Sequence, residues 1–306
     1  MTRTHITFLV LLAALLAAPF AVYPVLMMKV LCFALFACAF NLLLGFTGLL
    51  SFGHAAFFGT AAYATGYAMT HLPVTPEAGL ILGTLAAAAL GVVFGGLAIR
   101  RQGIYFAMIT LALAQMVYFF CLQAPFTGGE DGLQGVARGA LFGLLNLGND
   151  LVMYYFVLAV FVAGFLVIYR TIHSPFGQIL KAIRENEPRA LSLGYDVDRY
   201  KLVAFVLSAA LAGLAGATKT LVLGFATLTD VHWGTSGEVV LMTLVGGVGT
   251  VLGPIAGAII IVVLQNELAD KVGSWVTVIM GAIFVATVLA FRRGVVGEIA
   301  ARLGNK

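Results

Sequence analysis

The chain alternates between long apolar segments and short stretches rich in polar residues, glycine or proline. Ten apolar segments lie at residues 6–18, 25–45, 47–70, 78–99, 103–124, 151–170, 202–224, 237–249, 253–267 and 274–291. A helix that crosses the hydrocarbon core of a bilayer needs about 20 predominantly apolar residues, and most of these segments reach that length. The pattern predicts an all-α, polytopic integral membrane protein with about ten transmembrane helices.

The two segments near residue 250 are too short for a simple crossing. A helix over residues 237–249 would rise about 20 Å, less than the hydrocarbon core of about 30 Å. Together with residues 253–267 it could form two short spans, a re-entrant pair or one broken helix.

Composition gives the same picture. Hydrophobic residues make up 61% of the 306 residues and charged residues only 10%, whereas a soluble domain has about 45–50% apolar and about 25% charged residues. An ordinary cytosolic enzyme, a disordered chain and a disulfide scaffold are therefore excluded. The three cysteines lie inside apolar segments, as expected of small buried hydrophobic residues.

The N-terminus allows two interpretations. Arg3, the apolar run 6–18 and the small residues around Ala17–Ala21 resemble a signal peptide. Alternatively, the run is an uncleaved first membrane helix that ends near Pro19. Because nine more apolar segments follow, we favour the uncleaved helix.

The positions of the basic residues orient the chain. With a cytoplasmic N-terminus and ten crossings, 13 of the 17 Lys and Arg residues fall on the cytoplasmic side, as the positive-inside rule requires. Lys29 and Lys219 fall near the outer ends of spans, where their side chains can snorkel toward water. Both termini are thus predicted to be cytoplasmic.

No linker divides the chain, so residues 1–306 are predicted to form a single transmembrane domain. Two hydrophilic stretches are sizeable, an external one at 125–150 and a cytoplasmic one at 171–201. Both flank the sixth span, so spans 1–5 and 6–10 have opposite orientations. This arrangement is typical of a 5+5 inverted repeat, which we state as a hypothesis.

The first candidate for a translocation pathway is a glycine-rich break after Asn41. Glycine is costly inside a helix, and unwound backbone at membrane depth is tolerated only where it faces protein or a water-filled cavity. The candidate residues there are Thr47, Gly48, Ser51, Gly53 and His54. The alternative is that these small residues only permit tight helix packing, with His54 as a buried packing residue.

The second candidate is the glycine-rich stretch 246–257, with Gly246, Gly247 and Gly249 as pathway residues. Because proline suits the first turn of a helix, Gly253-Pro254 can equally mark a tight turn between two helices.

Glu238 is the acidic residue closest to an apolar run. It could contact the substrate at a gate, form a salt bridge with Lys219, or lie at a helix N-terminus where the dipole favours it.

The cytoplasmic stretch 171–201 predicts two short helices. Ser174 is a suitable N-cap before Pro175, Asn186 can cap a second helix, and Gly194 can end it. Ile179, Ala182 and Ile183 give the first helix an apolar face. That face could be covered by a partner's groove, by the cytoplasmic ends of the spans, or by the membrane surface.

These features together resemble a known family, the permease subunits of bacterial branched-chain amino acid ABC importers. The resemblance is specifically to the second of the two homologous permeases. The resemblance extends over nearly the whole chain. It rests on six stretches in one order, namely Asn41–Gly59, Gly103–Ala112, Thr127–Gly132, Gly177–Tyr195, Trp233–Glu238 and Gly246–Gly257.

The resemblance implies a channel-forming subunit and not an enzyme. It implies that the cytoplasmic loop docks into an ATPase subunit through Gly177, Ala182, Arg184, Glu185, Asn186, Glu187 and Gly194. It implies that the external loop with Gly128, Gly129, Glu130 and Asp131 faces a periplasmic substrate-binding protein. The other implied partners are a homologous permease and two ATP-binding cassette subunits in a bacterial inner membrane; no nucleic acid is involved.

The residues themselves agree with this division of labour. No phosphate-binding Gly-x-x-x-x-Gly-Lys-Ser/Thr motif occurs, and the five histidines form no metal-binding pair. We therefore expect no bound cofactor or metal, with ATP and magnesium used by the partner subunits.

The expected function is the import of branched-chain or related hydrophobic amino acids by alternating access. One alternative is the same architecture serving another small solute, such as urea or an amide. Another is an ion-coupled secondary carrier, which requires a buried carboxylate in the helix core. The acidic residues here are predicted to lie at span ends or in loops.

Overall fold

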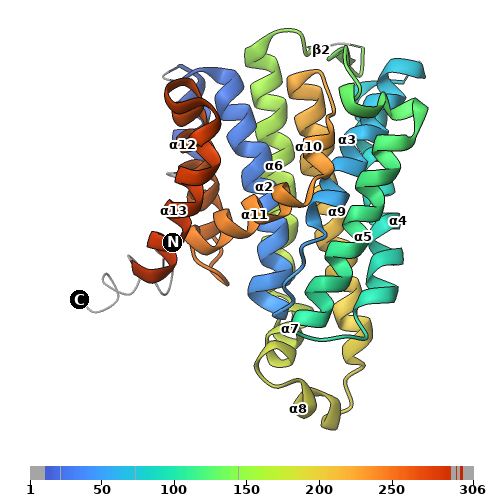
Figure 1. Cartoon of the computed structure of the whole chain (residues 1–306), viewed down its shortest axis with the longest axis vertical. Helices are drawn as coiled ribbons and strands as arrows, with labels where there is room; N and C mark the ends of the chain where they lie inside the picture. Colours follow the sequence, from blue (N-terminus) through green and yellow to red (C-terminus); the bar gives the residue numbers. More distant parts are fainter. Residues whose placement is uncertain are drawn as a thin grey trace.

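The computed structural model describes residues 11–20, 22–72, 74–143, 145–290, 294 and 297–298. Six long helices run along the long axis of a bundle (Figure 1): α2 (Pro24–Thr47), α3 (His54–His71), α4 (Pro76–Ala98), α5 (Ile104–Gln123), α6 (Asp150–His173) and α9 (Val197–Leu223). The C-terminal part adds α10 (Leu228–Val231), α11 (Trp233–Gly246), α12 (Gly253–Val272) and α13 (Val276–Ala290).

Short elements complete the two ends of the bundle. One end carries η2 (Pro125–Thr127), η3 (Gly129–Asp131) and the antiparallel strands β1 (Ala140–Leu141) and β2 (Leu145–Asn146). The opposite end carries α7 (Pro175–Glu185) and α8 (Glu187–Ser192) (Figure 1). The remaining 3₁₀ turns are η1 (Ala18–Phe20) and η4 (Gly273–Trp275). The stretches 125–150 and 171–201 thus lie at opposite ends, as predicted.

The predicted all-α membrane fold is confirmed. The helices α2, α4, α5, α6 and α9 are each long and apolar enough to cross a bilayer. The other predicted spans, including Leu11–Phe20, α3, α11, α12 and α13, are also helical but shorter or less apolar. That the chain crosses ten times stays a prediction, as does the inverted repeat.

Burial divides the long helices into inner and outer ones. In α2, 94% of the most apolar window is buried, whereas in α5 the share is 28%. α9 packs against α2, α3 and α4, and its glycines allow this close approach. A Cβ atom at Gly216 would collide with the carbonyl oxygen of Phe58, so only glycine fits where α9 crosses α3.

The helices near residue 250 form an antiparallel hairpin. Glu238 lies beside Gln265, and Gly246 lies beside Gly253. This pairing excludes the single broken helix. α11 begins at Trp233, four residues earlier than predicted, because the His232 side chain accepts a hydrogen bond from the Gly234 amide and caps the helix. With 14 residues, α11 rises about 21 Å and runs obliquely across the middle of the bundle (Figure 1).

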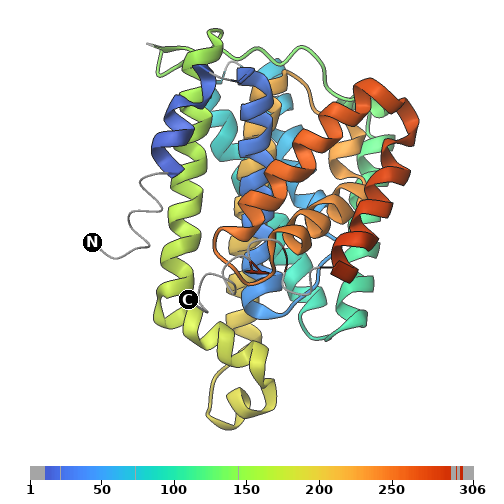
Figure 2. The same ribbon diagram turned by 90° about the vertical axis from the view of Figure 1, so that its left-hand side faces the viewer.

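The N-terminal segment packs like a first helix of the bundle. Residues Leu11–Phe20 lie alongside α6 (Figure 2), where the Tyr154 hydroxyl donates to the Leu15 carbonyl at 2.6 Å. Five of the basic residues used to orient the chain lie outside the described residues, namely Arg3, Arg292, Arg293, Arg302 and Lys306.

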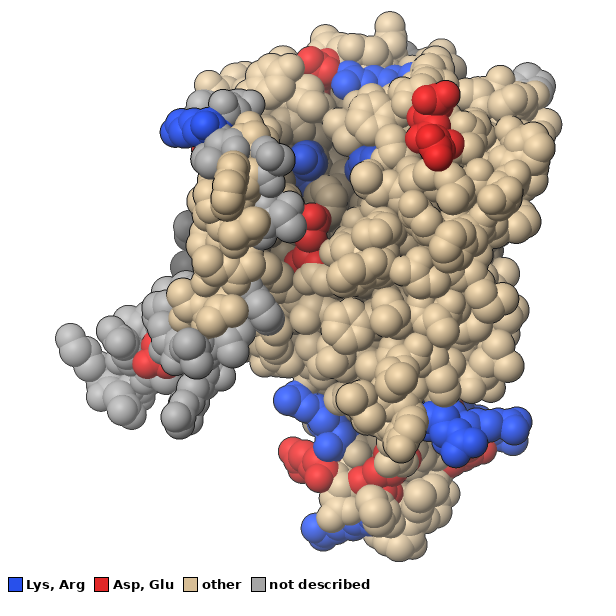
Figure 3. All heavy atoms as spheres, in the orientation of Figure 1, with Lys and Arg blue, Asp and Glu red and all other residues tan. Residues whose placement is uncertain are grey.

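Charge is distributed as expected of a protein surrounded by lipid. On the face shown in Figure 3, charged side chains gather at the two ends of the bundle, and the band between them is largely free of charge. The exception is a hollow in the upper half of this face, where basic and acidic side chains meet.

Candidate functional site

The two short helices at the α7–α8 end form as the sequence predicts. The Ser174 hydroxyl accepts a hydrogen bond from the Gly177 amide at 3.3 Å, with Pro175 in the first turn of α7. The Asn186 side chain accepts from the Arg189 amide at 3.1 Å and caps α8. Gly194, with φ of +87°, ends that turn in the left-handed region. Both predicted caps are confirmed.

The apolar face of α7 is covered by the chain itself. Leu180 and Ile183 are buried, and α7 contacts the ends of α2, α6 and α9. Of the three coverings left open by the sequence, the ends of the spans are the one observed. The prediction that Ala182 shares this face is wrong, because Ala182 is exposed and lies about 200° around the helix from Leu180.

The residues expected to dock on a partner fall into two groups. Ala182, Glu185, Asn186 and Gly194 are exposed to solvent, whereas Gly177 is buried against the end of α6 and does not reach the surface. In contrast, Glu187 forms an ion pair at 2.6 Å with Lys201, whose side chain is only 2% exposed. Arg184 donates to the carbonyl oxygen of Gly45 and so ties α7 to the end of α2. Glu187 and Arg184 therefore hold the loop in place, and the first group is free to contact another protein.

The glycine-rich break lies between α2 and α3, and it is a turn. Gly48 adopts φ of +78° and ends α2, and α3 begins only at His54, whereas the apolar pattern predicted a helix from residue 47. Gly53 lies against the backbone of Thr110. Ser51 accepts from the Gly53 amide at 3.2 Å, and Thr47 donates to the Leu42 carbonyl at 3.3 Å.

His54 is a buried residue in an aromatic cluster. Its Nε2 lies 2.8 Å from the Ser208 hydroxyl, which donates to the Ala39 carbonyl. Its ring meets Phe40 and Phe205 edge to face. These contacts fit the packing interpretation of His54.

The second glycine-rich stretch joins the α11–α12 hairpin to α2. The Asn41 side chain donates to the Thr250 carbonyl and accepts from the Gly249 amide, both at 2.9 Å. Gly246 and Gly253 let the two helices touch through their backbones. The turn 247–252 thus lies beside the Arg184–Gly45 contact, which places α7, α2 and the hairpin at one junction.

A cavity of about 510 Å³ opens in the half of the bundle away from α7 and α8. Its walls come from α2, α9, α10, α11 and α12 together with the start of α13. It combines charged, amide, hydroxyl and apolar side chains. The lining residues are Lys29, Phe33, Lys219, Leu223, Phe225, Thr227, Thr229, Asp230, Thr235, Glu238, Gln265, Asn266, Ala269, Gly273 and Val276. Of the predicted pathway residues, only Glu238 lines this cavity.

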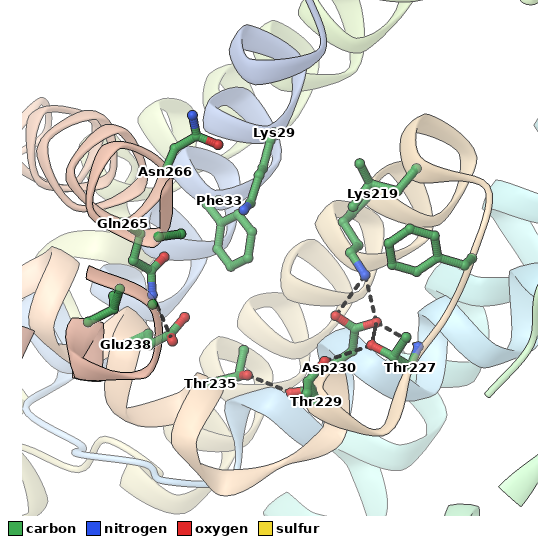
Figure 4. A pocket seen from close by; sticks show the side chains of 15 residues that line it. Lys29, Phe33, Lys219, Thr227, Thr229, Asp230, Thr235, Glu238, Gln265 and Asn266 are labelled. Carbon is green, nitrogen blue, oxygen red and sulfur yellow. Dashed lines mark hydrogen bonds and ion pairs between the residues drawn. The ribbon is translucent and has the colours of Figure 1, made fainter. Parts of the chain in front are cut away.

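Lys219 forms a buried ion pair with Asp230 (Figure 4). The Nζ atom lies 2.9 and 2.7 Å from the two carboxylate oxygens, and the Thr227 amide donates to the same carboxylate at 3.0 Å. The expectation that Lys219 snorkels to water is therefore wrong, and of the alternatives left open for Glu238, the salt bridge with Lys219 is not observed. Asp230 lies on the short helix α10, in the connection between α9 and α11, and its side chain is only 5% exposed.

Glu238 points into the cavity from α11. Its Oε1 accepts a hydrogen bond from the Gln265 amide at 2.9 Å. It lies in the second turn of α11 and not in the first, so the helix dipole does not account for it. Of the three roles weighed for Glu238, a contact with whatever occupies the cavity fits this position.

Several lining residues were missed by sequence reasoning. Lys29 was expected to snorkel, and Phe33, Gln265 and Asn266 gave no signal, because they look like ordinary positions within apolar or amphipathic helices. Only the fold brings α2 and α12 to the same cavity. A signal did exist for Lys29, since a lysine in the second turn of a membrane helix is costly unless it is partnered or functional.

The loop that was predicted to be external presents its two carboxylates to solvent. Glu130 and Asp131 are exposed on η3, and Gly128, with φ of +79°, forms the turn before it. Gly129 is half-buried in η3, and the following Leu133 pairs with Ala226 by backbone hydrogen bonds. The loop is thereby attached at the end of α9 near the cavity. Within the described residues no group of three or more His, Cys, Asp or Glu side chains is suited to a metal ion.

Comparison with known proteins gives a consistent answer. Residues 7–288 match the family described as "Branched-chain amino acid transport system / permease component". The chain is 30% identical over 258 residues to the high-affinity branched-chain amino acid transport system permease protein LivM of Escherichia coli K12, covering 75% of this chain and 60% of that protein.

Permeases with other named cargoes also match. The chain is 30% identical over 193 residues to the autoinducer 2 import system permease protein LsrC of Klebsiella pneumoniae, covering 61% of this chain and 53% of that protein. It is 28% identical over 207 residues to the ribose import permease protein RbsC of Escherichia coli K12, covering 63% and 62%. The chain thus spans 53–62% of the length of these relatives. No solved structure matches it.

Proposed function

This chain belongs to the branched-chain amino acid transport permease family, and from that premise we propose that it is the membrane-spanning permease subunit of an ATP-driven importer of branched-chain or related hydrophobic amino acids. Its partners in this proposal are a homologous permease, two ATP-binding cassette subunits and a periplasmic substrate-binding protein. The complex would lie in a bacterial inner membrane, with both termini of this chain in the cytoplasm and with ATP and magnesium bound only by the ATPase subunits.

The observation that carries the proposal is a mechanical link between α7 and the walls of the cavity. α7 is tied through Arg184 to Gly45 at the end of α2. Four residues earlier in α2, Asn41 holds the turn 247–252 between α11 and α12. Helices α2, α11 and α12 all line the cavity.

This link supports the proposal of alternating access. A displacement of α7 by a partner would move the end of α2 and the hairpin turn together, because hydrogen bonds connect them. The same helices form the cavity at the other end, so their tilt would change its width and its opening. Transport would then be conformational, and no residue of this chain would need to react chemically.

The surface for the ATPase is formed by the exposed part of the α7–α8 end. Ala182, Glu185 and Asn186 are exposed beside one another at the end of α7. The buried face of α7 and the Glu187–Lys201 ion pair fix their positions. A rigid, exposed helix end suits the transmission of force to the spans.

The test is substrate uptake into vesicles reconstituted with this chain, its partner permease, the ATPase subunits and the binding protein. We expect leucine accumulation that requires ATP and every partner. Accumulation by this chain alone, driven by an ion gradient, would replace the proposal with the ion-coupled carrier. ATP-driven uptake of urea or an amide in place of leucine would show that the proposed substrate is wrong and that the proposed ATP-driven importer is right.

A further inference from the structure

The cavity holds four charged side chains, and they are not equivalent. Two are basic, Lys29 and Lys219, and two are acidic, Asp230 and Glu238. Lys219 and Asp230 neutralise one another through two short contacts, and Lys219 also lies 4.8 Å from the centre of the Phe225 ring. This pair is complete within the chain, so it needs no ligand.

Lys29 and Glu238 attract one another across the cavity, but among the described residues they do not form an ion pair. Among the residues that the structure describes, neither forms an ion pair, and the Lys29 ammonium makes no hydrogen bond. Glu238 is held by one hydrogen bond, from Gln265 to Oε1. Figure 4 shows the Lys29 ammonium and the Glu238 carboxylate pointing into the same space, from α2 and from α11. Both side chains are half-buried.

Two half-buried charges that act on one another only across a gap are poorly compensated, and this is unfavourable unless something bridges them. A ligand that compensates both must carry one negative and one positive group close together and have no net charge. An α-amino acid fits this description, because its carboxylate and ammonium groups are attached to the same carbon atom. A sugar, urea or an amide has no charge to offer to either side chain.

We infer that Lys29 binds the carboxylate, and Glu238 the ammonium, of a zwitterionic α-amino acid during its passage through this cavity. The inference rests on the proposed function and adds to it the residues that recognise the substrate. Gln265 is a positioning residue, since its amide holds the Glu238 carboxylate toward the cavity. The apolar walls, with Phe33, Leu223 and Val276, are available to the hydrophobic side chain of the amino acid.

The test pairs each protein charge with the ligand charge that it binds. The probes are leucine, 4-methylpentanoate, which lacks the ammonium, and 3-methylbutylamine, which lacks the carboxylate. Binding to the assembled transporter in lipid nanodiscs, without binding protein or ATP, is measured by saturation-transfer NMR titration. In the wild-type complex we expect leucine to bind about tenfold or more tightly than either analogue, since a hydrogen-bonded charge pair contributes that much.

The variants then assign the partners. Glu238→Gln should weaken the binding of leucine and of 3-methylbutylamine by about tenfold to a hundredfold. The affinity for 4-methylpentanoate should not change. Lys29→Gln should weaken the binding of leucine and of 4-methylpentanoate and leave the affinity for 3-methylbutylamine unchanged. The matched controls are Glu267→Gln and Lys271→Gln on α12, an exposed ion pair outside the cavity, and they should change none of the three.

Equal affinity of the wild-type complex for all three probes would overturn the inference, and this measurement needs no variant to fold. If both variants weakened the binding of all three probes equally, the inference would also be overturned, because such a result would indicate general damage to the cavity. Failure here leaves ATP-driven leucine uptake intact, whereas failure of the proposed function removes that uptake itself. The two can therefore be distinguished.

Discussion

Among the described residues, each end of the molecule has an ion pair with a buried lysine, but the surroundings of the two pairs differ. At the α7–α8 end, Lys201 pairs with Glu187, and the neighbouring charges of Glu185 and Arg189 are exposed to solvent. In the cavity, Lys219 pairs with Asp230, and the neighbouring charges of Lys29 and Glu238 are half-buried and unpaired. The first pair fixes the shape of a surface, whereas the second stands beside charges that remain available to a ligand.

The difference gives a criterion for distinguishing charged residues that stabilise the fold from charged residues that are available to bind a ligand. Burial alone does not distinguish them, because both pairs contain a buried lysine. The distinguishing property is whether the chain itself supplies the partner. By that criterion Lys219, Asp230, Lys201 and Glu187 are structural, and Lys29 and Glu238 are the candidates for function.

The largest expected effect comes from breaking the pair in the cavity. Lys219→Met leaves Asp230 charged and buried, which costs about 3–5 kcal/mol of stability. We expect a clearly lower thermal unfolding midpoint for the purified complex in detergent. Lys219→Met combined with Asp230→Leu should recover much of this loss, because no uncompensated charge remains.

The control is Lys271→Met, which breaks an exposed pair with a distance of 3.6 Å to Glu267 and should cost at most about 1 kcal/mol. If Lys219→Met unfolds at the wild-type temperature, the Lys219–Asp230 pair is not the structural element that we describe.

The next largest effect concerns the junction that connects the two ends. Asn41→Leu removes the hydrogen bonds to Gly249 and Thr250 and leaves two backbone groups without a partner, each costing about 1–3 kcal/mol where it is buried. We expect a lower unfolding midpoint and fewer leucine molecules imported per ATP hydrolysed, because the hairpin turn no longer follows α2.

Thr84→Val offers a matched comparison for Asn41→Leu, since the Thr84 hydroxyl bonds only to Leu80 within its own helix. A normal ratio of uptake to hydrolysis in Asn41→Leu would exclude the junction as the coupling element.

A smaller effect is expected from the pair at the α7–α8 end. Glu187→Gln leaves Lys201 without its counter-ion, and because the Glu187 side chain is 20% exposed, water relieves part of the cost. We expect a loss of about 1–3 kcal/mol, confined to the loop. Hydrogen exchange should rise at the amides of α8 and remain at wild-type values in α4. Unchanged exchange in α8 would show that the ion pair does not hold the loop.

What the sequence could predict follows the same division between local and distant contacts. The apolar segments, the Ser174 and Asn186 caps and the break at Gly48 depend on neighbouring residues, and all were predictable. The face of α7 was assigned less well, because Ala182 and Leu180 are both apolar and only the packing on α2, α6 and α9 decides between them.

The cavity could not be predicted, because its parts are far apart along the chain. Lys29 and Glu238 are 209 residues apart, and nothing near either residue indicates that they share a cavity. Asp230 lies between two apolar segments of the sequence, and only the fold shows that Thr227 and Lys219 hold its carboxylate inside the bundle. Glu238 itself was identified, since a carboxylate beside an apolar run is costly enough to need a reason.

The smallest effect on stability, with a large effect on function, is expected at Glu185. Its side chain is exposed, so Glu185→Arg should change the unfolding free energy by less than about 0.5 kcal/mol. If α7 docks on an ATPase subunit, reversing this charge should reduce co-purification of that subunit and lower ATP-driven uptake.

Reversing the charge of Glu187 as well would be less informative, because Glu187→Arg also breaks the pair with Lys201. Lys271→Glu on α12, an exposed lysine outside the proposed docking surface, reverses a charge elsewhere and serves as the control. Full ATPase co-purification and full uptake in Glu185→Arg would show that the end of α7 is not the docking surface, even though the loop is folded as described.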